Sequence, residues 1–86
     1  MATKEEILQK HNLTPRVWSF FASAYFTLSR ELQEKFNKAT IDISENATDL
    51  TKDEALFISS FDLDMARKGL KPILTEKAKK KLKEVV

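Results

Sequence analysis

The stretch VWSFFASAYFTL, residues 17–28, decides the fold expected for this chain. Its aromatic and aliphatic side chains are separated only by alanine and small hydroxyl residues, so a helix here is apolar on nearly every side. Such a helix needs burial on most of its surface. Just before it, Thr14 is followed by Pro15, a pair typical of a helix N-cap and first turn. We therefore predict a helix from Pro15 to Leu28 at the centre of the domain.

Capping residues mark the starts of other helices. Thr3 with Glu6, and Thr51 with Glu54, have the spacing of a capping box, in which side chain and backbone bond reciprocally. Thr75 stands before the last apolar pattern in the same way. We predict the other helices at residues 4–11, 30–37, 52–68 and 75–86.

The breaks between helices are less uniform. The segment Thr40 to Leu50, TIDISENATDL, is polar and β-branched and alternates isoleucine with acidic residues, so we predict the main connection there. Ser29 either ends the helix before it or lies within it. In the helix that follows the connection, we expect a stripe through Leu56 and Leu63. Gly69, the sole glycine, is predicted to end that helix in the left-handed conformation.

Composition favours one small all-α domain. The 86 residues leave room for a single core, 42% of them are apolar, and one glycine and two prolines interrupt the chain. We expect a compact bundle of four to five short helices around the aromatic-rich helix. This single domain spans residues 1–86 and ends in a Lys-rich helix at about residues 75–86. The size suits a phage- or plasmid-type accessory protein.

Several classes of site and location are disfavoured by what the sequence lacks. Without cysteine there are neither disulfides nor thiolate metal sites. We expect no cofactor. The chain has neither a signal-like segment nor an apolar run of membrane-spanning length, so we expect a cytoplasmic protein with no membrane association.

Charge is divided unevenly along the chain. Residues 1–66 hold seven Lys/Arg against eleven Asp/Glu, whereas residues 67–86 hold eight against two. A basic end suits an anionic partner such as nucleic acid, which lysines can neutralise without reading its sequence. The alternative is a solvated lysine face on a terminal helix. Our candidate anion-binding residues are Arg67, Lys68, Lys71, Lys77, Lys79, Lys80, Lys81, Lys83 and Arg16.

The N-terminal helix pair resembles a helix-turn-helix at the level of the motif. Leu8 fits the buried residue of the first helix and Asn12 the turn residue, while Trp18 fits the core of the second helix. Arg16 and Ser19 then face outward as the recognition surface. A recognition helix usually exposes several long polar side chains, so two helices joined by a capped turn inside a bundle is the competing interpretation.

Catalytic and metal-binding patterns are weak. His11 is the only histidine, and a histidine near a helix end is typical of a charge that complements the helix dipole. Asp42, Ser44, Asn46 and Thr48 have the spacing of an EF-hand calcium loop, but Ala47 stands where the sharp turn needs glycine. We therefore expect neither an enzyme with a small-molecule substrate nor a metal site.

An 86-residue domain has little material to wrap an aromatic helix on all sides, so part of it should remain as an apolar contact surface. We favour a small non-enzymatic accessory or regulatory protein that binds another protein or a copy of itself. The alternative is a nucleic-acid-binding regulator that uses the Lys-rich helix and the N-terminal helix pair. The candidate protein-interface residues are Trp18, Phe20, Tyr25, Phe26, Phe57 and Phe61.

Overall fold

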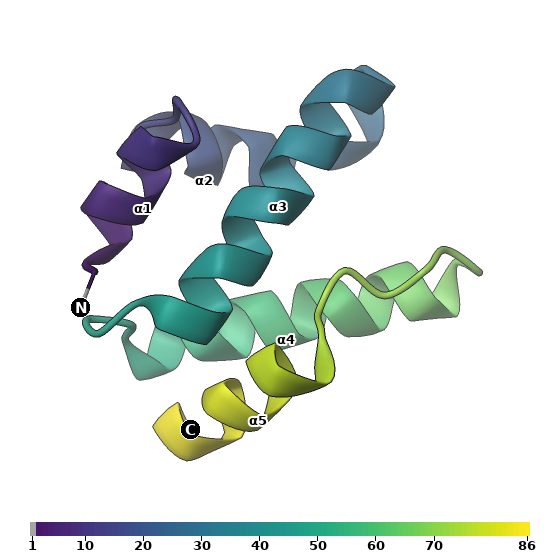
Figure 1. Ribbon diagram of the computed structural model, residues 1–86. Coiled ribbons are helices and arrows are strands. Elements are labelled where there is room, and N and C mark those ends of the chain that lie inside the picture. Colours follow the sequence, from purple (N-terminus) through teal and green to yellow (C-terminus); the bar gives the residue numbers. More distant parts are fainter. Residues whose placement is uncertain (1) are drawn as a thin grey trace.

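A computed structural model describes residues 2–86, which fold into α-helices and one short 3₁₀ helix (Figure 1). Within these residues no strand forms beyond a single bridge between Ala2 and Ala47. The predicted all-α bundle is confirmed. In chain order the elements are α1 (Lys4–Lys10), α2 (Pro15–Ser23), the 3₁₀ helix η1 (Tyr25–Thr27), α3 (Arg30–Asn46), α4 (Lys52–Arg67) and α5 (Glu76–Val85).

The predicted capping residues begin the helices. Both capping boxes form at α1 and α4, and Thr14 and Thr75 accept backbone N–H bonds at the starts of α2 and α5. Ser29 accepts a bond from the backbone N–H of Leu32, which answers the open question: it starts α3. Gly69 ends α4 at φ 75°, as predicted. Local sequence therefore fixes where most helices begin.

The predicted helix from Pro15 to Leu28 is wrong in length and in place. It ends at Ser23, and the chain turns through η1 before α3. The hydroxyls of Ser23 and Thr27 donate to the carbonyls of Phe20 and Ala24, in competition with the helical pattern. The turn carries Tyr25 back into the core, where it is 5% exposed.

The predicted connection at Thr40 to Leu50 is also wrong, because α3 continues to Asn46. Phe36, Ala39 and Ile43 follow one another at helical spacing and are all buried, so helical periodicity overrides the β-branched composition. Figure 1 places α3 in the middle of the molecule, where it packs against α1, α2 and α5. The central element of the bundle is thus α3 rather than the aromatic-rich α2.

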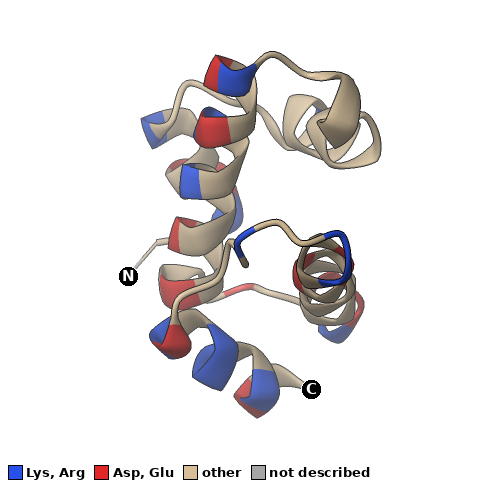
Figure 2. Cartoon of the chain, turned by 90° about the vertical axis from the view of Figure 1, so that its right-hand side faces the viewer, with Lys and Arg blue, Asp and Glu red and all other residues tan. Residues whose placement is uncertain are grey.

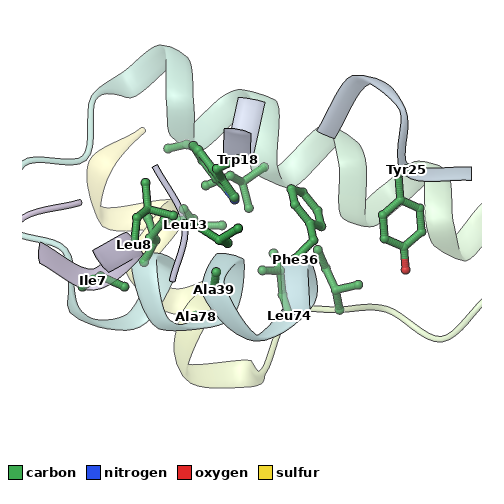
Figure 3. Packing of buried hydrophobic residues seen from close by; sticks show 14 of the residues in the cluster. Ile7, Leu8, Leu13, Trp18, Tyr25, Phe36, Ala39, Leu74 and Ala78 are labelled. Carbon is green, nitrogen blue, oxygen red and sulfur yellow. The ribbon is translucent and has the colours of Figure 1, made fainter. Parts of the chain in front are cut away.

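The core is organised around Phe36, which is almost fully buried on α3 (Figure 3). Its ring lies 5.6 Å from that of Tyr25, 5.5 Å from that of Phe61 and 6.3 Å from that of Trp18, between ring centroids. The indole N–H of Trp18 donates to the buried hydroxyl of Thr40 at 3.0 Å. One apolar cluster therefore joins α2, η1, α3 and α4, and the hydrogen bond from Trp18 adds a buried polar link to it.

The packed face of α4 is not the predicted one. Ala55, Ile58 and Met65 are buried, whereas Leu56 and Leu63 are 44% and 53% exposed. The helix packs against α5, and the loop between the two is fixed to α4 where the Asp62 carboxylate accepts the backbone N–H groups of residues 73 and 74. A leucine pair therefore faces away from the bundle. None of the helices in residues 2–86 has the length and apolar character that a membrane span needs.

Candidate protein-binding cleft

The six predicted interface residues divide into buried and exposed groups. Trp18 and Tyr25 are 6% and 5% exposed and belong to the core, so each offers little surface to a partner. Phe61 is half-buried and packs edge-on against Tyr25, with the ring centroids 5.0 Å apart. Phe20, Phe26 and Phe57 remain exposed. The exposed aromatic surface is thus carried by side chains from α2, η1 and α4.

The exposed aromatic residues do not form one patch. Phe26 lies beneath the ammonium group of Lys68, 3.9 Å from the nitrogen to the ring centroid. Phe20 is 61% exposed and lies beside Phe21 of its own helix, with ring centroids 6.3 Å apart. Phe57, by contrast, lines a cleft between α2 and α4. Only Phe57 therefore combines exposure with a concave surrounding.

The cleft is an open space of about 350 Å³. Its α2 wall consists of Trp18, Ser19, Ala22 and Ser23, and its α4 wall of Asp53, Glu54 and Phe57. In Figure 2, α2 with η1 and the end-on α4 lie on the same side of the molecule, with α3 beside both. Small residues on α2 leave the space open, because serine and alanine do not reach across to the aromatic ring on α4.

Charge at the cleft is one-sided. Arg16 is the only charged residue between Thr14 and Ser29, so the α2 wall is neutral, while α4 contributes Asp53 and Glu54. Burial of Glu54 alone would raise its pKa, but bonds from the Lys4 ammonium and from Thr51 outweigh burial and lower the pKa. Glu54 is therefore ionised at neutral pH and paired, and Asp53 adds a second, exposed negative charge.

The helix-turn-helix resemblance has a structural counterpart in the turn. Asn12 adopts φ 58°, the left-handed conformation assigned to the turn residue, and the Leu13 N–H bonds back to the Leu8 carbonyl at 2.8 Å. Arg16 and Ser19 are exposed as predicted. However, Ser19 lines the cleft that Asp53 borders, which is an unfavourable electrostatic setting for a phosphate backbone.

The basic candidates are mostly on the surface, but several lie near acidic groups. Lys79 is the half-buried exception, and its ammonium lies 4.0 Å from Asp62 and 3.8 Å from Glu76. Arg67 is 3.9 Å from Asp64. Exposed basic side chains are Arg16, Arg67, Lys68, Lys71, Lys77, Lys80, Lys81 and Lys83. Folding thus reduces the positive charge that the tail presents, without removing it.

A second, larger groove of about 1120 Å³ runs between α1, the end of α3 and α5. Lys77 and Lys81 stand on its α5 side. The opposite side carries Glu6 and Glu45, and Glu84 lies on α5 itself. The mixed charges point to no single ligand chemistry. In this groove, Lys77 and Lys81 of the tail lie near the negative charges of Glu6, Glu45 and Glu84.

The single histidine forms a half-buried pair with an acid. His11 Nε2 lies 2.8 Å from Asp42 Oδ2, and Asn46 donates to the other Asp42 oxygen at 2.7 Å. Burial alone would raise the pKa of Asp42, but the bonds from His11 and Asn46 and the charge of Lys10 lower it. Among residues 2–86, the His11 side chain has a hydrogen bond or ion pair to Asp42 alone, which joins α1 to α3.

The segment with EF-hand spacing does not have the conformation of a calcium loop. Asp42, Ser44 and Asn46 lie on α3, where Ser44 points away from the side of the helix that carries Asp42 and Asn46. Ser44 is buried and donates to the Thr40 carbonyl at 2.8 Å. Within residues 2–86 no group of His, Cys, Asp and Glu is arranged to hold a metal ion.

Sequence reasoning identified Phe57 and Trp18 but missed the rest of the cleft. Ser19, Ala22 and Ser23 are a run of small residues on one side of α2, and this spacing is the signal that could have indicated an unfilled groove. Its other wall depends on where α4 packs. No family model, curated protein or solved structure matches this chain.

Proposed function

We propose that this protein is a non-enzymatic accessory protein that binds another protein through the cleft between α2 and α4. The observation that carries the proposal is the cleft itself, in which the exposed ring of Phe57 faces a wall of small residues across an open space. A soluble monomer gains nothing in packing from leaving a large aromatic side chain 47% exposed beside an unfilled cleft.

The occupant that best fits is a basic amphipathic helix of a partner protein. Both walls are helix faces, and a third helix laid between them would direct apolar side chains at helical spacing onto Phe57 and Ala22. The acidic residues Asp53 and Glu54 on one wall, against a neutral second wall, favour lysine or arginine beside those apolar anchors. A small molecule suits the site less well, because few polar groups converge on the open space.

The sequence provides its own reporter, since Trp18 is the only tryptophan and lines the cleft. The probe is a tryptophan-free helical peptide of about 18 residues, because shorter isolated helices are marginally stable. It carries leucines at spacings of three and four and lysines elsewhere. We expect saturable changes in Trp18 fluorescence on titration, and much weaker binding of the same peptide with glutamate in place of lysine.

Two phenylalanine variants provide the matched comparison. Phe57→Ser removes the exposed ring on the cleft wall and is expected to weaken peptide binding at least tenfold, about the loss of 1.4 kcal/mol. Phe20→Ser removes a more exposed ring from α2 that does not line the cleft, and should leave the affinity unchanged. Equal effects of the two substitutions, or equal binding of the glutamate peptide, would refute the proposed site.

A further inference from the structure

The outward face of α4 carries a second, separate apolar feature. Leu56 and Leu63 are seven residues apart, which places them within about 20° of one another around the helix and two turns apart along it. Both are about half exposed, although Ile58 and Met65 on the opposite face of the same helix are buried. Ser59 and Ser60 lie between them and are exposed. The helix is therefore apolar on its packed side and partly apolar on its free side as well.

We infer that this face binds the same face of a second copy of the chain, with the two α4 helices antiparallel. The pattern is symmetric about a point between Ser59 and Ser60, because Leu56 and Leu63 are equally distant from it. A twofold axis through that point places Leu56 of each copy on Leu63 of the other. The serines at the crossing are small and let the helix backbones approach closely.

Charge supports the same arrangement. A twofold axis perpendicular to two antiparallel helices keeps each flank of α4 against the corresponding flank of the other copy. Asp53 and Arg67 lie on one flank and are nearly equidistant from the axis, so Asp53 of each copy meets Arg67 of the other. Lys52 lies at the level of the opposing Arg67 but on the other side of the leucines. Asp64 lies on the same flank, 3.9 Å from Arg67 of its own copy, so each Arg67 lies between Asp64 of its own copy and Asp53 of the other.

The available area sets the expected strength. α4 has 16 residues and is about 24 Å long, and a single pair of such helices buries less than the roughly 1,200 Å² at the lower limit of stable interfaces. We therefore expect a reversible dimer that forms at micromolar to higher concentration. Leu56 and Leu63 do not line the α2–α4 cleft, so this inference goes beyond the proposed function and is tested separately.

The first test is sedimentation equilibrium of the full chain from about 5 to 500 µM, a range that drives a weak dimer by mass action. The average mass should rise from 9.9 kDa towards twice that value. Leu63→Lys, an exposed substitution that leaves the core intact, should keep the protein monomeric throughout. Phe20→Lys replaces another exposed apolar residue by lysine, on α2, and should leave dimer formation unchanged. A monomer at every concentration, or a dimer that survives Leu63→Lys, overturns the inference.

Two further experiments test the pair of Asp53 with Arg67 and the point at which the two helices cross. Arg67→Asp should weaken the dimer, and adding Asp53→Arg to it should restore the dimer, which a merely structural role of Arg67 would not do. Because the chain has no cysteine, Ser60→Cys introduces one thiol beside the axis and should give a disulfide-linked dimer on mild oxidation. Ser19→Cys on α2 should not. Cross-linking of Ser19→Cys in preference to Ser60→Cys places any dimer elsewhere and overturns the inference.

Discussion

The hydrogen bond between Trp18 and Thr40 should be worth more to stability than its single contact suggests. Thr40→Val keeps the shape of the side chain but leaves the indole N–H of Trp18 without its acceptor, 3.0 Å away in a site where both residues are buried. An unsatisfied buried donor costs about 1–3 kcal/mol. A domain of this size has a total stability of about 4–13 kcal/mol. A loss of about 2 kcal/mol would lower the melting temperature by about 8–16 °C.

The assay is urea unfolding followed by circular dichroism, with the bond isolated by a double-mutant cycle. In a Trp18→Phe background the donor is absent, so Thr40→Val should cost far less than it does in the native chain, because two apolar partners leave nothing unsatisfied. Thr40→Ser, which keeps the hydroxyl, should cost about 1 kcal/mol for the lost methyl group. Equal costs of Thr40→Val in both backgrounds would refute the reasoning.

Three other predictions follow from the geometry. Because the pKa of Asp42 is lowered by folding, the pairing of its carboxylate stabilises the fold above about pH 4, and this stabilisation is lost as the pH falls through the folded-state pKa. Asp42→Asn should therefore flatten the dependence of melting temperature on pH between 7 and 3. Gly69→Ala should destabilise by about 1 kcal/mol in thermal unfolding because φ is 75°, even though no atom lies within 4 Å of the added Cβ; unchanged stability would contradict this. If the Lys-rich helix binds duplex DNA, the affinity measured by fluorescence anisotropy should fall about tenfold or more between 50 and 200 mM salt. Changing Lys79, Lys80 and Lys81 to Gln should reduce both the affinity and its salt dependence. An unaltered affinity would exclude the helix as the DNA contact.

Local sequence was sufficient for the helix boundaries that depend on nearby atoms. A capping box is formed within four residues, and a glycine at a helix end needs no partner elsewhere, so Thr3, Thr51 and Gly69 could be assigned from the sequence. The same is true of α5, whose Ala78 and Leu82 lie on one buried face. These features belong to single turns of helix, and their energetics do not depend on the rest of the fold.

The interior of the bundle was harder to predict, because propensity and burial disagreed there. The Thr40 to Asn46 segment has β-branched residues that disfavour helix, but helical geometry is what places Ile43 in the core and Thr40 on Trp18. The aromatic run failed in the opposite way: it predicted a long buried helix, whereas hydroxyl bonds to the backbone and the burial of Tyr25 end α2 at Ser23. Tertiary packing decided both cases.

The sequence by itself determined the fold class and the caps, since these follow from composition and from contacts within a few residues. Which apolar side chains stay exposed was decided only by the tertiary structure. Leu56 and Leu63 look in the sequence like ordinary core residues of α4, and they face outward because the rest of the bundle covers only the side of the helix that bears Ile58 and Met65. A helix of fixed sequence has several apolar directions, and the position of its neighbours selects the one that is buried.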